Sequence, residues 1–103
     1  ATKLHAVEFL RQRLGLEYKA VTFAGDSGND LDVMASAVPS ILVANASASV
    51  RRSAQDMARD AGHPTALYLA RGGYLGMNGN YAAGILEGLV HFRPEFGPWI
   101  EGT

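Results

Sequence analysis

The chain has 103 residues, of which 48% are hydrophobic and 18% charged, with no cysteine and a formal net charge of −1. This length fits one domain, and the apolar fraction is enough for a packed core. The near-neutral charge gives no electrostatic footprint for nucleic acid or an acidic membrane, and no apolar stretch approaches the roughly 20 residues of a membrane span. We therefore expect a protein that binds neither nucleic acid nor membranes, with the cytoplasm as its default location.

The first part of the chain predicts a helix, a strand and a second helix. Residues 3–14 carry apolar side chains at helical spacing, with Thr2 as the N-cap and Gly15 as the C-terminal stop. The apolar run at 21–24 has no polar alternation, which is typical of a parallel strand covered on both faces. Residues 30–37 are expected to form a short helix.

The rest of the chain repeats this alternation. Strands are expected at 41–44 and 66–70, with helices at 48–61 and 81–92. The glycine-rich stretch 71–80 is expected to be a loop. Strands and helices that alternate with short connections predict a parallel sheet with helices on its faces, so the fold class is α/β, a Rossmann-like three-layer α/β/α arrangement.

Two further expectations concern surfaces. Residues 94–103 contain two prolines and two glycines, which favours an irregular tail outside the domain at 1–93. We expect Phe96 and Trp99 to lie back on the domain. The polar face of the helix at 48–61, which includes Arg51, is most simply a solvated face.

Two carboxylates follow the first strand in the sequence GDSGND at 25–30. Gly25 and Gly28 should let the chain turn sharply as it leaves the sheet. Asp26 and Asp30 then lie at the carboxyl end of a parallel strand, where open α/β sheets bind their ligands. Carboxylates this close repel each other unless a cation or a proton lies between them, and Mg²⁺ is the natural partner.

The same residues also predict the start of a helix. Asp26, Ser27, Asn29 and Asp30 are all favourable N-cap residues, and acidic side chains suit the positive end of a helix dipole. The spacing alone does not separate this interpretation from a metal site. Lys3, by contrast, is electrostatically misplaced in the first turn of a helix, and a solvated surface lysine is its simplest explanation.

Taken together, these segments resemble the haloacid dehalogenase-like (HAD) phosphohydrolases, in the capped branch that includes the Cof-type phosphatases and sucrose-phosphate phosphatase. GDSGND at 25–30 is similar to the fourth motif of that family, and Lys3 stands where the third motif has a phosphate-binding lysine. Asn45, in VANA at 43–46, matches the asparagine of the family's GNA turn, with alanine in place of the usual glycine. AAGILEGLVHF at 82–92 is similar to the last core helix of sucrose-phosphate phosphatase-like members.

The resemblance implies a Mg²⁺-dependent phosphatase that hydrolyses a phosphomonoester through a phospho-aspartate. It implies that Asp26, Asp30 and Asn29 hold the metal ion. It also implies that Lys3 binds the phosphate and that Asn45 contacts the substrate. A sugar phosphate such as sucrose 6-phosphate is the implied substrate class.

The family's first motif, an acidic DxD after an early strand, is missing, so the nucleophilic aspartate is absent from this chain. The serine or threonine of the second motif and the cap domain are missing too. We therefore expect residues 1–93 to be the C-terminal part of a HAD-like core, inactive alone, whose partners are the missing N-terminal half and cap domain. The strand at 21–24 would then be an exposed sheet edge, which favours self-association.

Two other classes of function stay open. A non-catalytic α/β binding module, or a truncated fragment without activity, would use residues 25–30 only as a helix cap. A response regulator or other flavodoxin-like domain would need an acidic pocket on an early strand, and the sequence has none. Arg71 and Tyr74, in the glycine-rich stretch, either contact a substrate or belong to an ordinary surface loop.

Overall fold

Three parallel strands form one sheet in the computed structural model, which describes residues 2–43, 45–72 and 80–101. The strands are β1 (Phe23–Gly25), β2 (Ser40–Leu42) and β3 (Leu67–Leu69), in the order β1-β2-β3. Gly25 lies opposite Leu42, which in turn lies opposite Leu69. All three strands therefore end at the same edge of the sheet, and β1 is an outer strand, as expected.

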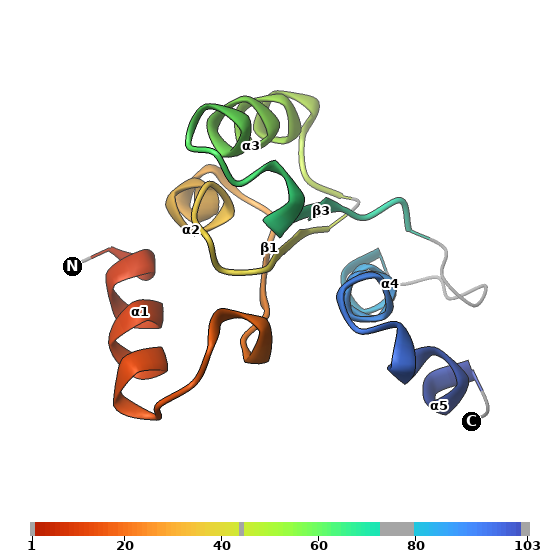
Figure 1. Cartoon of the computed structure of the whole chain (residues 1–103). Coiled ribbons are helices and arrows are strands. Elements are labelled where there is room, and N and C mark those ends of the chain that lie inside the picture. The colour runs from red at the N-terminus through yellow and green to blue at the C-terminus, as the bar shows by residue number, and fades with distance from the viewer. Residues whose placement is uncertain (1, 44, 73–79, 102–103) are drawn as a thin grey trace.

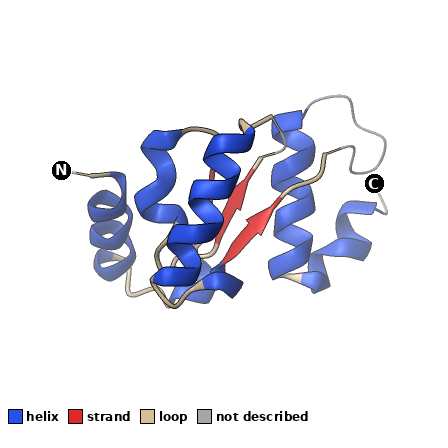
Figure 2. Ribbon diagram, turned by 90° about the horizontal axis from the view of Figure 1, so that it is seen from above, coloured by secondary structure: helices blue, strands red, loops and turns tan. Residues whose placement is uncertain are grey.

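Helices cover both faces of this sheet (Figures 1 and 2). They are α1 (Lys3–Arg13), α2 (Leu31–Met34), α3 (Ala48–Asp60), α4 (Asn80–Phe92) and α5 (Gly97–Glu101). In both views α2 and α3 lie on one face and α4 on the other, with α1 outside α2 and α5 outside α4. This arrangement confirms the predicted three-layer α/β/α fold. None of the described helices is both long and apolar enough to cross a membrane.

The core lies mainly between the sheet and the layer of α2 and α3. Met34, Leu42 and Ala54 are fully buried there, and partly buried apolar side chains from β1 and β3 pack against them. On the opposite face α4 approaches β2 closely, because a Cβ atom at Gly88 would lie only 2.4 Å from Cγ1 of Ile41. A side chain at Gly88 would therefore push α4 away from the sheet.

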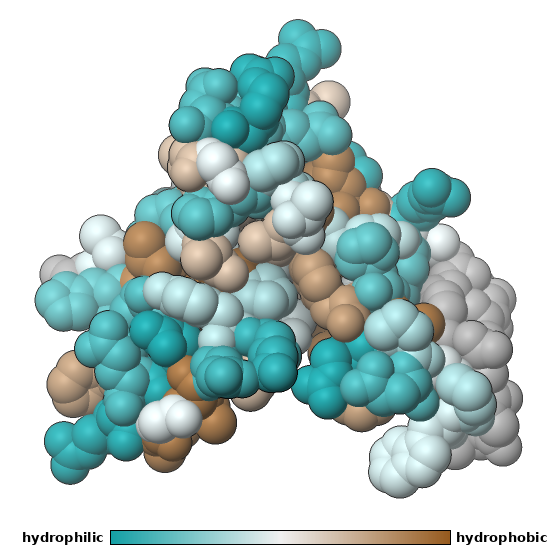
Figure 3. Space-filling view, in the orientation of Figure 1, coloured by the Kyte–Doolittle hydropathy of each residue, from teal (hydrophilic) through white to brown (hydrophobic). Residues whose placement is uncertain are grey.

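The ends of α1 follow the prediction, but much of its apolar surface is exposed. The Thr2 side chain accepts a hydrogen bond from the His5 amide at 3.1 Å, and Gly15 ends the helix with a φ of 67°. However, Phe9, Leu10 and Leu14 are 57%, 57% and 66% exposed. Among the described residues nothing covers this face, and Figure 3 shows the surface hollowed between the lobe of α1 and the lobe of α4 and α5.

The tail was predicted to be irregular over 94–103, but it is helical in its described residues, 94–101. A 3₁₀ turn at Pro94–Phe96 leads directly into α5. Proline is compatible with the first turn of a helix, because the amide that it lacks has no partner there anyway. Trp99 is 82% exposed and does not lie back on the domain, whereas Phe96 is partly buried below the Arg93 guanidinium.

Candidate functional site

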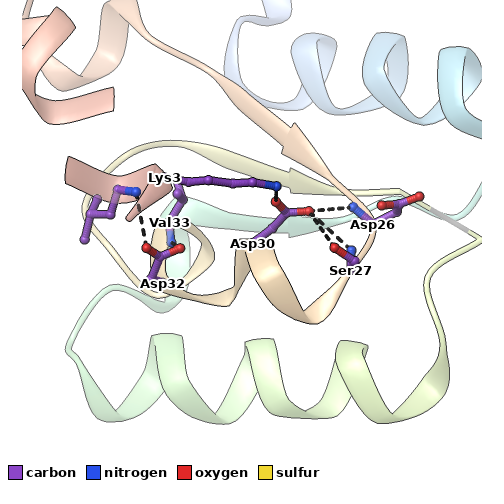
Figure 4. Close-up of polar contacts among 7 residues, drawn as sticks. Lys3, Asp26, Ser27, Asp30, Asp32 and Val33 are labelled. Atoms are coloured by element: carbon purple, nitrogen blue, oxygen red, sulfur yellow. Dashed lines mark hydrogen bonds and ion pairs between the residues drawn. The ribbon is translucent and has the colours of Figure 1, made fainter. Parts of the chain in front are cut away.

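Lys3 and Asp30 meet at the carboxyl end of β1, although 27 residues separate them in the sequence. The Lys3 Nζ atom lies 2.6 Å from Oδ1 of Asp30 (Figure 4). The Asp30 side chain is buried, whereas about half of the Lys3 side chain is exposed. The lysine in the first turn of α1 therefore has a buried carboxylate as its partner, which accounts for its unfavourable place in the helix.

The second carboxylate oxygen of Asp30 holds the turn that follows β1. Oδ2 accepts hydrogen bonds from the amides of Asp26 at 3.1 Å and Ser27 at 3.3 Å, and from the Ser27 hydroxyl at 3.4 Å. Ser27 and Asp30 form a reciprocal capping box around the 3₁₀ turn Gly28–Asp30. The expected helix start is thus present, and the same carboxylate also contacts Lys3.

Gly25 is required here for space, and not for the sharp turn that we expected. Neither Gly25 nor Gly28 has a positive φ. A Cβ atom at Gly25 would lie 2.3 Å from Oδ2 of Asp30, whereas one at Gly28 would meet nothing within 4 Å. Because Gly25 has no side chain, the Asp30 carboxylate can lie directly against the end of β1.

The charges of this pair stabilise each other. Burial alone would raise the pKa of Asp30, but the Lys3 ammonium and the amides of Ser27 and Asp26 outweigh burial and lower that pKa. The hydrogen bond to Asp30 correspondingly raises the pKa of Lys3. Both groups are therefore charged at neutral pH.

Asp32 makes a second connection between α1 and this turn, which was not predicted from the sequence. Its Oδ2 accepts a hydrogen bond from the Leu4 amide at 3.2 Å, and its Oδ1 accepts one from the Val33 amide at 2.8 Å. An acidic residue in the first turn of a helix is common, so the sequence carries no signal for the contact with α1.

The three predicted metal ligands offer an incomplete but chemically suitable set of oxygen atoms. Asp26 and Asn29 are exposed, and the Asp26 carboxylate points away from Asp30 (Figure 4). Within the described part of the chain, no three His, Cys, Asp or Glu side chains converge to hold a metal. Mg²⁺ is commonly bound through one or two carboxylates and keeps several waters, so Asp26, Asp30 and Asn29 fit part of such a site.

Asn45 follows β2 at the same edge of the sheet. The Val43 amide donates a hydrogen bond to the Gly25 carbonyl at 3.1 Å, which aligns the ends of β1 and β2. Asn45 comes two residues later and is exposed. The described hydrogen bonds and ion pairs do not join Asn45 to Lys3 or Asp30, so its role in substrate binding stays a prediction. Ala44 and Tyr74 lie outside the described residues.

Comparison with known proteins places this sequence in a family. A model of the family described as sucrose-6F-phosphate phosphohydrolase matches residues 1–93. The chain belongs to this family. It is also 52% identical over 101 residues to a protein of Nitrosococcus oceani named "Putative HAD-like hydrolase", a match that covers 98% of this chain and 27% of that protein. The chain thus spans about a quarter of that relative's length, and no solved structure matches it.

Membership of the sucrose-6F-phosphate phosphohydrolase family confirms the resemblance to HAD-like enzymes. Two polar side chains of this family member were not predicted to contact the sheet. The first is Arg51 of α3, whose guanidinium donates hydrogen bonds to the carbonyls of Val43 at 3.3 Å and Ala70 at 3.1 Å. The interpretation of Arg51 as part of a solvated face is therefore wrong. Its place in the first turns of α3 was the available signal, since a cation is unfavourable there.

The second is Glu87 of α4. Its carboxylate accepts hydrogen bonds from the Arg71 amide at 2.8 Å, the Gly72 amide at 3.0 Å and the Tyr68 hydroxyl. Burial and the hydrogen bond to Glu87 raise the pKa of Tyr68 to about 12. An acidic residue within a largely apolar helix was the signal for Glu87, because such a carboxylate needs partners.

Proposed function

We propose that this chain is the metal- and phosphate-binding part of a Mg²⁺-dependent phosphatase that acts through a phospho-aspartate, with a sugar phosphate such as sucrose 6-phosphate as its substrate. One observation carries the proposal: the Lys3–Asp30 ion pair lies at the carboxyl end of β1, beside Asp26. It brings a cation and two carboxylates to the edge where open α/β sheets bind ligands. Membership of the sucrose-6F-phosphate phosphohydrolase family supports this reaction class.

Each residue has a separate role in the proposed site. Asp26, Asp30 and Asn29 would hold Mg²⁺, which when bound supplies the positive charge that lets an anionic nucleophile approach a phosphate. Lys3 would neutralise the phosphate. Because an ammonium has three N–H donors and Asp30 takes one of them, the other two can reach phosphate oxygens.

The nucleophilic aspartate would come from another part of a longer polypeptide. No DxD sequence follows an apolar strand in these 103 residues. The N. oceani relative extends well beyond the matched region, which covers 27% of it. We call the proposed longer polypeptide the full-length protein, and we expect the 103-residue chain alone to be inactive.

An assay of the full-length protein tests the proposal. Phosphate release is measured with a panel of sugar phosphates that includes sucrose 6-phosphate, with and without Mg²⁺. We expect Mg²⁺-dependent release from at least one of them, and a large loss in Asp26→Asn. The matched control is Asp56→Asn on α3, whose carboxylate pairs with Arg59 and should not affect activity. Failure to release phosphate from any sugar phosphate would refute the proposal.

The Ser27–Asp30 capping box favours one alternative, a non-catalytic α/β binding module. In that case Asp30 serves only to start α2 and to anchor Lys3. In such a module, Mg²⁺ would change neither the stability nor the chemical shifts of residues 25–30. In the phosphatase, Mg²⁺ would change both.

A further inference from the structure

We propose that Arg51 and Glu87 are positioning residues that clamp the backbone after β3 from opposite faces of the sheet and so fix one rim of the substrate site. The inference rests on the proposed function, because it assigns the rim to the phosphatase site. It concerns neither the metal ligands nor Lys3.

Arg51 approaches from the α3 side of the sheet. Its two terminal nitrogen atoms donate to the carbonyls of Val43, directly after β2, and Ala70, directly after β3. The planar guanidinium presents its donors in a fixed fork, which suits two carbonyl oxygens on neighbouring strands. One side chain therefore ties together the ends of β2 and β3.

Glu87 approaches from the opposite side, on α4. Its two carboxylate oxygens accept hydrogen bonds from consecutive amides, those of Arg71 and Gly72. The Tyr68 hydroxyl contributes a further hydrogen bond to Oε2. Gly72 has a φ of 87°, so the chain turns at the point where the carboxylate holds it.

The two contacts converge on three consecutive residues. Arg51 holds the carbonyl of Ala70, and Glu87 holds the next two amides. Ala70 is itself fully buried, and α4 packs so closely that a Cβ atom at Gly84 would lie 3.3 Å from the Ala70 Cβ. The backbone therefore leaves the sheet in a defined direction at the carboxyl edge.

This edge also carries the candidate substrate residues. Asn45 lies two residues beyond the Val43 carbonyl that Arg51 holds, and the exposed Arg71 is held through its own amide by Glu87. Binding groups work only when their supports are rigid, since a misplacement of about 1 Å can cost roughly 10²-fold in rate. The clamp should therefore govern substrate binding. The described hydrogen bonds of Arg51 and Glu87 do not reach the turn after β1 that contains Asp26 and Asp30.

Kinetics of clamp variants in the full-length protein test the inference. In Arg51→Met and Glu87→Gln we expect KM for the phosphate ester to rise by about tenfold, while the Mg²⁺ concentration for half-maximal activity does not change. Arg51→Lys keeps the charge but loses the fork, so its KM should rise as well. Arg52→Met and Glu17→Gln change exposed residues of the same charge and should resemble the wild type.

Amide hydrogen exchange provides the second readout. In Glu87→Gln the amides of Arg71 and Gly72 should exchange faster, while those of β1 keep their protection. Unchanged exchange at these two amides would overturn the clamp. An unchanged KM, or a parallel loss of Mg²⁺ activation, would overturn its role at the substrate site. An inactive wild-type protein would instead refute the proposed function, and with it the substrate role of the rim. In that case, amide exchange at Arg71 and Gly72 would still show whether Glu87 holds the backbone after β3.

Discussion

The Nζ atom of Lys3 lies 2.6 Å from Oδ1 of Asp30, so the first residue of α1 is joined to the turn that follows β1. The hydrogen bond from the Leu4 amide to Asp32 reinforces this junction. No described residue of α1 is fully buried. Polar contacts at its N-terminus therefore help to attach the helix to the domain, and this is also where we place the phosphate-binding group.

Replacing Lys3 should impair both the junction and the proposed reaction. Lys3→Met leaves the buried Asp30 carboxylate without its cation, so we expect a lower melting temperature. In the full-length protein, phosphatase activity should fall by roughly 10²-fold or more, the usual effect of losing a charge-stabilising donor. Lys19→Met, a change at an exposed lysine paired with Glu17, is the control. Full activity in Lys3→Met would contradict the proposed role.

Gly25 and Gly28 form a matched pair for testing the packing of Asp30. Gly25→Ala places a Cβ atom 2.3 Å from Oδ2 of Asp30 and should destabilise the protein by about 1–3 kcal/mol. Gly28→Ala meets nothing within 4 Å and should change stability by less than about 0.5 kcal/mol. Urea unfolding of both variants measures the difference. Equal effects would show that Gly25 is not needed for space.

Glu87 predicts a loss of stability in acid. Burial opposes its ionisation, but hydrogen bonds from Tyr68, Arg71 and Gly72 lower the pKa of Glu87 below its ordinary value of 4.5. Its stabilising effect is thus complete above that value and is lost as the pH falls through the lowered pKa of the folded state. In urea unfolding across this range, Glu87→Gln should show a shallower pH dependence than the wild type. Glu17→Gln should follow the wild type, and a Glu87→Gln curve parallel to it would contradict the prediction.

The 103-residue chain alone should self-associate. In the described part of the chain, β1 presents an outer edge with unpaired backbone groups. The exposed apolar side chains of Phe9, Leu10 and Leu14 on α1 add an apolar surface. The double variant Leu10→Lys/Leu14→Lys should sediment closer to a monomer, whereas Met57→Lys on α3 should not. A wild-type chain that stays monomeric at all concentrations in ultracentrifugation would argue against this expectation.

The sequence predicts the layers of the fold better than its surfaces. Helix α3 at Ala48–Asp60 follows from apolar periodicity, because each helix must bury one face. The parallel direction of the strands follows from their alternation with helices. The contact between Lys3 and Asp30 was not predicted, because the resemblance implies a phosphate ligand and a metal ligand and not an ion pair between them. The helix predicted at 30–37 is shorter in the structure. Its first residue belongs to the 3₁₀ turn Gly28–Asp30, and α2 ends at Met34.

Periodicity shows which residues share a face, but not whether another element covers it. The apolar face of α1 and the exposed Trp99 could not be placed from the sequence for this reason. Arg51 differs, because a long side chain on a polar face can bend back to reach strand carbonyls. Its contacts depend on the distance between α3 and the sheet, and local sequence does not encode that distance.

Binding of Mg²⁺ to the GDSGND turn tests the central claim most directly. The full-length protein is titrated with Mg²⁺ while the amide chemical shifts of Gly25–Asp30 are followed by NMR, in the wild type and in Asp26→Asn. We predict saturable shifts in the wild type that need a much higher Mg²⁺ concentration in the variant. Shifts that are absent in the wild type, or identical in both proteins, would contradict the assignment of Asp26 and Asp30 as metal ligands.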